Sequence, residues 1–343
     1  MRVDLGLSNR VVLITGASRG TGAGTARVLA GEGATVLVHG FVAAPTEQVV
    51  ADIRSRGGRA EAVVGDICTD GGADAIANSV RALGYDVDVL INNYGVAEGA
   101  GWFDDSAQSW HEQFDKNVVS AFRMVQRFVP GMRARGWGRV VFLSTIGATR
   151  PRANLPAYYS AKTALPGTTV SLMKELAGTG ITVNTISPGI IATDEVIASF
   201  TERARRKGES TEWPSLQRLM VESMPNPTGR VPTTEDIGRV IAFVVSEAGW
   251  HLNGLHLRVD GGAVDCVTCS SVDAVDDRCE VSSHLEFETR CDMDIGRFAN
   301  DRADACTVAF DDRLRVAALG VDRKRMAQHR GTERHRHLSR HDV

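Results

Sequence analysis

The chain lacks long apolar runs and has no marked excess of charge of either sign. No stretch of its 343 residues approaches the roughly 18 uncharged apolar positions that a membrane span needs. The first ten residues, MRVDLGLSNR, lack the apolar core of a secretory signal peptide. The formal net charge of −3 provides no general attraction to nucleic acids or anionic membranes. These absences predict a cytoplasmic protein with neither a membrane nor a nucleic acid as partner.

Cysteine is scarce in most of the chain, where Cys68 is the only one before residue 265. The other five lie in the final quarter, at Cys266, Cys269, Cys279, Cys291 and Cys306. This quarter also has one lysine, twelve arginines and few glycines. It contains too few apolar positions to offset the entropy lost on folding. We therefore predict a single folded domain at 1–264 and a poorly ordered C-terminal extension at 265–343.

Two other interpretations of the extension remain open. Cys266 and Cys269, with Cys279, Cys291 and His284, contain donors suited to zinc, but the second close pair typical of structural zinc sites is missing. Disulfides are not expected in a cytoplasmic chain. A shifted reading frame would also explain the rise in Arg, Asp, His and Cys. We predict no metal site.

Apolar segments of strand length alternate with helix-length segments between residues 10 and 260. The expected strands are 11–15, 35–38, 60–64, 87–91, 139–143, 182–186 and 255–259. The expected helices are 22–32, 46–56, 70–83, 106–134, 157–177 and 234–247. Most of the strands are apolar on both faces, which is typical of a buried parallel sheet. The pattern predicts an α/β fold, with a doubly wound, Rossmann-like and mostly parallel sheet of seven strands.

Residues 194–232 interrupt this alternation. They are rich in charge and contain Pro214, Pro225 and Pro227, with apolar positions such as Trp213 between them. An amphipathic segment of this kind suits a mobile cover over a substrate. We predict a substrate-covering helical insertion, and a surface helical pair without a substrate role is the alternative.

A glycine-rich turn follows the first expected strand. Glycines allow a tight turn whose backbone N–H groups approach a pyrophosphate, and the next helix adds the partial positive charge of its N-terminus. The predicted contacts are Gly16, Ser18, Arg19, Gly20, Thr21 and Gly22. The turn therefore predicts a dinucleotide-binding site.

The end of the second expected strand lacks the carboxylate that would bind both ribose hydroxyls of NAD. It has His39, Gly40 and Phe41 instead. Arg19 can pair with a 2′-phosphate. The sequence favours NADP(H), and NAD(H) stays open because Phe41 is not basic. Asp66, beside Ile67, is suited either to the adenine amino group or to a solvent-facing turn.

A tyrosine and a lysine lie one helical turn apart at Tyr158 and Lys162. A phenol ionises near pH 10, and an ammonium one turn away is expected to favour the phenolate and so to lower its pKa. Thr145 or Ser144, at the end of the preceding strand, can donate to a substrate oxygen. Asn117 can hold a water that leads from the lysine to solvent, or it can be a buried amide bonded to backbone. Pro188 and Gly189 form a turn that can approach a nicotinamide.

These motifs, in this order and at these spacings, resemble the short-chain dehydrogenase/reductase family, in the branch that includes the 3-oxoacyl-carrier-protein reductases. The resemblance extends from about residue 7 to 263. It includes the TGxxxGxG loop at 15–22, the NNxG element at 92–95, Asn117, the YxxxK pair, Pro188-Gly189, and the terminal RVDGG at 258–262.

The resemblance implies hydride transfer between the nicotinamide and a carbonyl or secondary alcohol, with a thioester-linked carbonyl as one option. Tyr158 would protonate the oxygen, while Lys162 would lower the tyrosine pKa and bind the nicotinamide ribose. Further cofactor contacts would come from Asn93, Gly95, Ile191 and Thr193. The family's helical pairing across two-fold axes implies a homodimer or homotetramer.

Two departures from the family pattern leave an alternative function open. Tyr94 stands where the family has a small residue, and it either reshapes the pocket or points outward. The hydroxyl thirteen residues before the tyrosine belongs to Thr145, where serine is usual, and Ser144 is the alternative. The competing function is a catalytically retired nucleotide-binding sensor or scaffold.

Overall fold

A computed structural model describes residues 4–264 of the chain. The chain divides into two units, residues 1–268 and 269–343. The predictions for 265–343, which are the poorly ordered extension, the zinc site and the shifted reading frame, lie outside the described residues.

Seven strands form one parallel sheet, as the alternating pattern predicted. The strands are β1 (Val11–Ile14), β2 (Thr35–Gly40), β3 (Arg59–Val64), β4 (Val89–Asn92), β5 (Gly138–Leu143), β6 (Ile181–Pro188) and β7 (His256–Val259). Their order across the sheet is β3-β2-β1-β4-β5-β6-β7, and every neighbouring pair is parallel. The predicted doubly wound fold is therefore confirmed.

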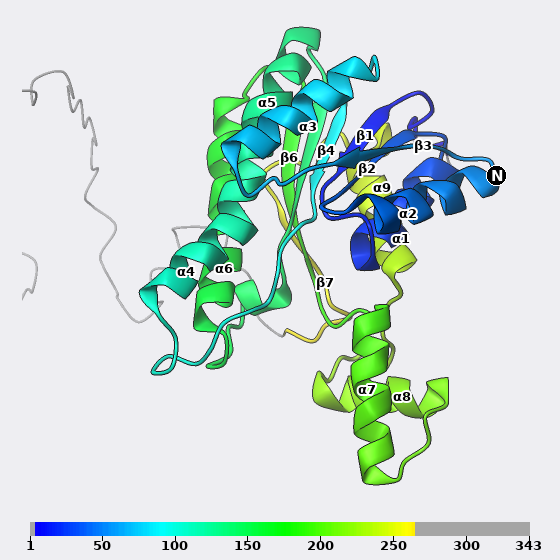
Figure 1. Cartoon of the computed structure of the whole chain (residues 1–343), viewed down its shortest axis with the longest axis vertical. Coiled ribbons are helices and arrows are strands. Elements are labelled where there is room, and N and C mark those ends of the chain that lie inside the picture. The colour runs from blue at the N-terminus through cyan, green and yellow to red at the C-terminus, as the bar shows by residue number, and fades with distance from the viewer. Residues whose placement is uncertain (1–3, 265–343) are drawn as a thin grey trace, which may run out of the picture. The chain divides into compact units, whose positions relative to one another are not determined.

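Helices cover both faces of this sheet (Figure 1). They are α1 (Gly20–Gly31), α2 (Ala43–Ser55), α3 (Asp70–Ala82), α4 (Ala107–Phe114), α5 (Ser120–Arg135), α6 (Pro156–Glu175), α7 (Asp194–Lys207), α8 (Trp213–Ser223) and α9 (Thr234–Val245). None of the helices within residues 4–264 is long and apolar enough to cross a membrane.

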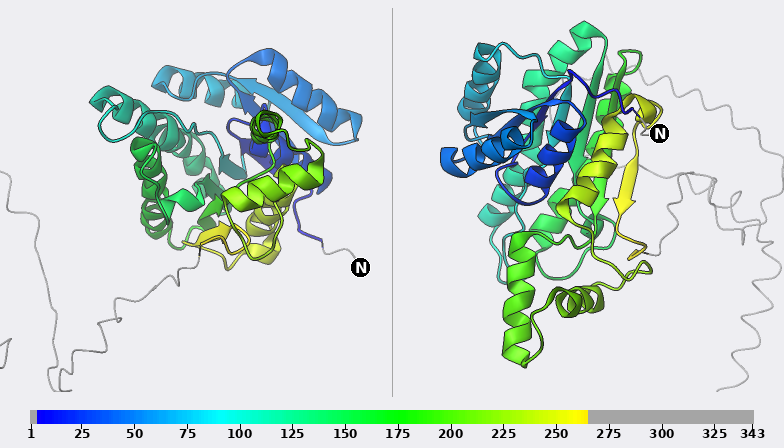
Figure 2. Two further views of the ribbon diagram at one scale, coloured as in Figure 1. Left: turned by 90° about the horizontal axis from the view of Figure 1, so that it is seen from below. Right: turned by 90° about the vertical axis from the view of Figure 1, so that its right-hand side faces the viewer.

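Alternate residues along each strand divide the core into two clusters. Val12 and Ile14 of β1 pack with α1, α2 and α9, whereas Leu13 packs with α3, α5 and α6. Because successive side chains of a strand point to opposite faces, one apolar strand serves both clusters. Figures 1 and 2 show the two helical layers on either side of the sheet.

The chain reverses its direction of winding beside β1. Strands β2 and β3 lie on one side of β1, and the chain then crosses back to place β4 on the other side of β1. In such sheets ligands bind where the carboxyl ends of the strands diverge at this reversal. The loops after β1, β4, β5 and β6 meet there.

One predicted helix differs in detail from the structure, and the predicted helical insertion is present. The helix expected at 106–134 is interrupted by a π-helical turn, Asp115–Val119, between α4 and α5. The 194–232 segment forms α7 and α8, which follow β6 and lie below the sheet in Figure 1. These two helices share a small apolar cluster with Leu216, Leu219 and Met220 at its centre.

Candidate active site

The loop between β1 and α1 has the backbone that its glycines predicted. Gly16 and Gly20 adopt positive φ angles of 62° and 55°, a region that side chains disfavour. A Cβ at Gly22 would lie only 2.7 Å from the Gly16 carbonyl oxygen. Arg19 precedes α1 without capping it through its side chain, so the first backbone N–H groups of the helix are available to an anion.

His39, at the end of β2, holds this loop in place. Its Nδ1 accepts a hydrogen bond from the Gly16 N–H at 3.1 Å, and its Nε2 lies 3.0 Å from the Gly65 carbonyl oxygen. Since Nδ1 must accept, the imidazole is neutral with its proton on Nε2. Burial is the main cause that lowers the pKa of His39 from 6.5 to about 4. This role of His39 was not predicted from the sequence, although a histidine at the end of a largely apolar strand was a signal of it.

Asn93 supports the same loop from β4. Its Nδ2 donates to the carbonyl oxygens of Thr15 and Gly16 at 2.9 and 3.0 Å, and its backbone N–H donates to Thr15 Oγ1. Asn93 was predicted to bind the cofactor. In the structure, its amide N–H groups position the glycine loop.

A pocket of about 350 Å³ opens beside the glycine loop. Five of its lining residues are predicted cofactor contacts: Gly16, Ser18, Arg19, Asn93 and Gly95. Phe41 and Tyr94 form an aromatic wall in which the ring centres lie 4.7 Å apart. Tyr94, whose position the sequence left open, therefore points into the pocket region rather than to bulk solvent. Its hydroxyl lies 3.8 Å from Cys68 Sγ.

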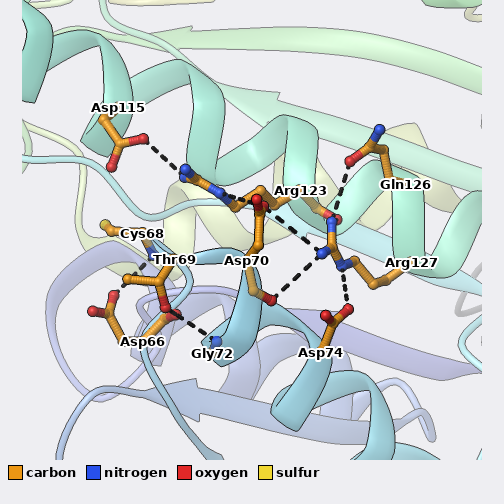
Figure 3. A network of polar contacts seen from close by, with 10 residues as sticks. All are labelled: Asp66, Cys68, Thr69, Asp70, Gly72, Asp74, Asp115, Arg123, Gln126 and Arg127. Carbon is orange, nitrogen blue, oxygen red and sulfur yellow. Dashed lines mark hydrogen bonds and ion pairs between the residues drawn. The ribbon is translucent and has the colours of Figure 1, made fainter.

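Asp66 occupies the turn after β3, and its side chain accepts from the Cys68 N–H at 2.8 Å. A network of polar contacts extends from this turn to α5 (Figure 3). Arg123 joins Asp70 of α3, at 3.0 Å, to Asp115 of the π turn, at 2.9 Å. Arg127 adds a second bond to α3 through Asp74 at 3.0 Å. The network fixes the position of the turn after β3 relative to the π-helical turn.

Lys162 is buried where α6 meets the end of β5. Its Nζ donates to the Leu143 carbonyl oxygen at 2.8 Å, and its own carbonyl oxygen accepts from Ser144 Oγ at 2.8 Å. Burial lowers the pKa of the Lys162 ammonium from 10.5 to about 8. The hydroxyl of Ser144 is thus committed to joining β5 and α6.

Thr145, the other candidate hydroxyl, meets Tyr158. A hydrogen bond between the two side chains lowers the pKa of Tyr158, but burial of the ring outweighs it and raises the pKa from 10 to about 12. The predicted net lowering of the phenol pKa is therefore wrong for this structure, because burial of the ring is the larger effect.

Asn117 lies within the π turn and is buried. Its Oδ1 accepts from the Val96 N–H at 3.1 Å, while its Nδ2 donates to the carbonyl oxygens of Val96 and Gln113, each at 3.0 Å. A Cβ at Gly95 would lie 2.5 Å from both Asn117 Oδ1 and Lys162 Nζ. The amide and the ammonium thus approach each other across a glycine that leaves them room.

The remaining predicted residues follow β6. Gly189, after Pro188, donates its N–H to the Val259 carbonyl oxygen at 3.0 Å, and Ile191 packs against the main core. Thr193 caps α7 and lies 3.8 Å from the Cβ position of Gly20. Arg19 Nε lies 3.4 Å from a Glu195 carboxylate oxygen. The start of α7 therefore lies beside the glycine loop.

Metal ligands do not gather here. Across the part of the chain that the structure describes, no group of three or more His, Cys, Asp or Glu side chains could hold a metal ion.

Comparison with known proteins yields consistent likenesses over this part of the chain. A family model described as short chain dehydrogenase matches residues 10–204. Short-chain reductase protein NovJ of Streptomyces niveus is 34% identical over 253 residues, covering 74% of this chain and 93% of that protein. The structure of L-sorbose reductase from Gluconobacter frateurii, complexed with NADPH and L-sorbose, has a TM-score of 0.72 at 29% identity, covering 77% and 100% of the two chains. That of 3-oxoacyl (acyl-carrier-protein) reductase from Agrobacterium tumefaciens, with NADP bound, has a TM-score of 0.68 at 31% identity, covering 76% and 98%.

Proposed function

The chain belongs to the short-chain dehydrogenase family, and on this premise we propose that it transfers a hydride between NADP(H) and a carbonyl or secondary alcohol substrate. One observation carries the proposal: the Tyr158 phenol meets the Thr145 hydroxyl at the same end of β5 where Lys162 is buried. A phenol, a hydroxyl and an ammonium form an acid–base set for a carbonyl oxygen.

The described residues fit a dinucleotide. The positive φ angles at Gly16 and Gly20, the uncapped start of α1 and the adjoining pocket suit a pyrophosphate. The region after β2 contains Phe41 and no carboxylate, and Arg19 is exposed on the loop. Both features favour a 2′-phosphate and thus NADP(H). The other proposed contacts with the cofactor are Ser18, Thr21, Gly22, Asp66, Ile67, Pro188, Gly189, Ile191 and Thr193.

NADP(H), when bound, supplies or accepts the hydride, and the protein manages the proton. In reduction, Tyr158 gives its proton to the carbonyl oxygen while Thr145 donates a hydrogen bond to that oxygen. The Lys162 ammonium, one helical turn away, stabilises the phenolate that forms. Asn117 positions the backbone of residues 95–96 beside Lys162. It also helps to hold the water from which the proton given up by Tyr158 is replaced.

The protonation state of Tyr158 fits the role of proton donor. With a pKa of about 12 the phenol is protonated at neutral pH, so it carries the proton that a ketone oxygen receives on reduction. We propose a reductase acting on ketones.

The 194–232 segment covers the substrate in this proposal. Met224 and Pro225, which follow α8, line a pocket of about 360 Å³ together with Thr145. A substrate bound beside the catalytic hydroxyl would therefore touch the end of this segment.

The proposal also includes a cytoplasmic homodimer or homotetramer. Phe122 of α5 is 52% exposed, and a hollow of about 510 Å³ lies between α5 and α6. Large exposed apolar surfaces of this kind suit a self-complementary two-fold contact. Sedimentation of the full chain should give a multiple of the single-chain mass, and a single-chain mass would refute this part.

The decisive assay follows the absorbance of reduced nicotinamide with a panel of ketones and oxoacyl thioesters, with NADPH and NADH in parallel. We expect turnover with NADPH, a fall in kcat of about 100-fold or more in Tyr158→Phe, and unchanged NADPH binding by fluorescence titration. Arg19→Gln should weaken NADPH binding but not NADH binding. Tight cofactor binding without turnover would instead indicate a nucleotide-binding sensor or scaffold.

A further inference from the structure

Two arginines line the pocket that contains the proposed catalytic hydroxyl. Arg150 and Arg152 lie on the loop between the short 3₁₀ turn Ile146–Ala148 and α6, and they share the 360 Å³ pocket with Thr145. The other described lining residues include Ile146, Met224 and Pro225, and no Asp or Glu is among them. Within residues 4–264, the pocket has positive charge on apolar walls.

Neither guanidinium is neutralised by the described part of the protein. Arg150 and Arg152 have no carboxylate partner within residues 4–264, whereas Arg123 and Arg127 of α5 are bonded to Asp70, Asp115 and Asp74. Both side chains are exposed and line the pocket without a counter-charge among its lining residues. An anion bound in the pocket would neutralise part of this positive charge.

The chemistry of the pair selects the anion. Guanidinium groups bind carboxylates and phosphates through paired N–H donors, with a geometry that a neutral ketone cannot match. We propose that the substrate carries an oxyanionic group, a carboxylate or a phosphate, that Arg150 and Arg152 bind while its carbonyl lies at Thr145 and Tyr158. This inference rests on the proposed function and names the substrate class: oxo acids or oxo phosphates rather than neutral ketones.

Matched substrates test the proposal. Full-length enzyme with NADPH is assayed on 4-oxopentanoate and its methyl ester, on acetoacetate and its methyl ester, and on dihydroxyacetone phosphate and dihydroxyacetone. We expect at least one anion to be preferred over its neutral partner. Arg150→Gln and Arg152→Gln should each raise the KM for that anion about tenfold or more, with a smaller change in kcat and little change for the neutral partner.

Arg81→Gln is the matched control, because Arg81 of α3 is exposed and lies outside both this pocket and the 194–232 segment. Its KM values should equal those of the wild type. The acid and phosphate pairs distinguish the two oxyanions. Equal turnover of charged and neutral partners, or unchanged KM values in both pocket variants, would overturn the inference while leaving the proposed reductase intact.

A second measurement does not depend on turnover. Phenylglyoxal modifies accessible arginines, and peptide mass spectrometry gives the rate at each site. With NADPH present, 4-oxopentanoate or inorganic phosphate should slow modification at Arg150 and Arg152 but not at Arg81. Equal rates with and without either anion would overturn the inference even if no ketone were turned over.

Discussion

Adjacent hydroxyls at the end of β5 have different partners. Ser144 Oγ donates to the Lys162 carbonyl oxygen, whereas Thr145 meets the phenol of Tyr158. The first bond joins β5 to α6, and the second reaches the group that we propose to react. The contacts therefore favour Thr145 as the catalytic hydroxyl, with Ser144 as a residue that positions α6.

We predict that Thr145→Val lowers kcat about 100-fold, because the substrate oxygen loses a donor, while the thermal midpoint changes little. Ser144→Ala should keep most of the activity and lower the midpoint, since a buried carbonyl loses its partner. Initial rates and thermal melts measure both effects. If Thr145→Val retains activity and Ser144→Ala abolishes it, the assignment is reversed.

The pH profile of the proposed reduction should follow Lys162. Its ammonium, with a pKa lowered to about 8 by burial, is charged below that pH and neutral above it. Because the charge stabilises the forming phenolate, kcat/KM should fall tenfold per unit as the pH rises beyond about 8.

Lys162→Arg keeps its charge far beyond this range and should remove the alkaline limb of that profile. A limb near pH 8 that persists in the arginine variant would assign the titration to another group. Circular dichroism confirms that the variant is folded.

Some residue roles could not be predicted from spacing alone. The i, i+4 relation of Tyr158 and Lys162 correctly places both on one turn of α6, but spacing does not measure burial, which decides the direction of the tyrosine pKa. His39 could not be paired with Gly16 and Gly65, because the contacts join three different strand ends.

At the scale of elements, α3 and α5 are held together by arginine. Arg123 is 14% exposed and has two carboxylate partners on different elements (Figure 3). Arg133, near the end of α5, lies 3.8 Å from Glu175 and both side chains are largely exposed. The two arginines provide a matched pair for substitution.

Arg123→Met should lower the free energy of unfolding by about 1–2 kcal/mol, a range that allows for the exposure of Asp70. Arg133→Met should change it by less than about 0.5 kcal/mol. Urea denaturation of both variants measures the difference. Equal losses would mean that the network of Figure 3 does not stabilise the fold.

Helix continuity was the least predictable property of the elements. Apolar periodicity predicts one helix over 106–134, and it cannot reveal the single extra residue that makes Asp115–Val119 a π turn. That turn contains Asn117, whose buried side-chain amide forms hydrogen bonds with the backbone of residues 96 and 113. The deviation thus falls at a proposed catalytic position, where π turns are often found.

At the scale of the whole molecule, acid should destabilise the protein through His39. The folded-state pKa, about 4, lies below the unfolded value of 6.5, so the unfolded chain binds a proton first. The contribution of the neutral imidazole is complete above pH 6.5 and is lost as the pH falls toward 4. Protonation of Nδ1 would also remove the hydrogen bond that it accepts from the Gly16 N–H and bring two N–H groups together.

His39→Asn keeps an acceptor at this site but does not titrate. Between pH 6.5 and 4, wild-type unfolding free energy should fall by up to about 3 kcal/mol more than that of the variant. Urea denaturation across this range measures both proteins. Parallel curves for the two would contradict the role of His39, since the carboxylates contribute equally to each.

The fold was more predictable than the site. Val/Ile/Leu-rich segments such as 11–15 and 182–186 are buried on both faces, so their pattern identifies parallel strands. The pockets could not be predicted in this way, because Arg150 and Met224 come together only through packing.

The apolar cluster shared by α7 and α8 is separate from the two clusters that hold the sheet. Substitutions at Leu216, Leu219 or Met220 therefore alter packing mainly within residues 190–231 and leave the frame of the sheet intact. Substitutions can therefore accumulate in this segment, the proposed substrate cover, while the glycine loop and the Tyr158–Lys162 turn stay unchanged.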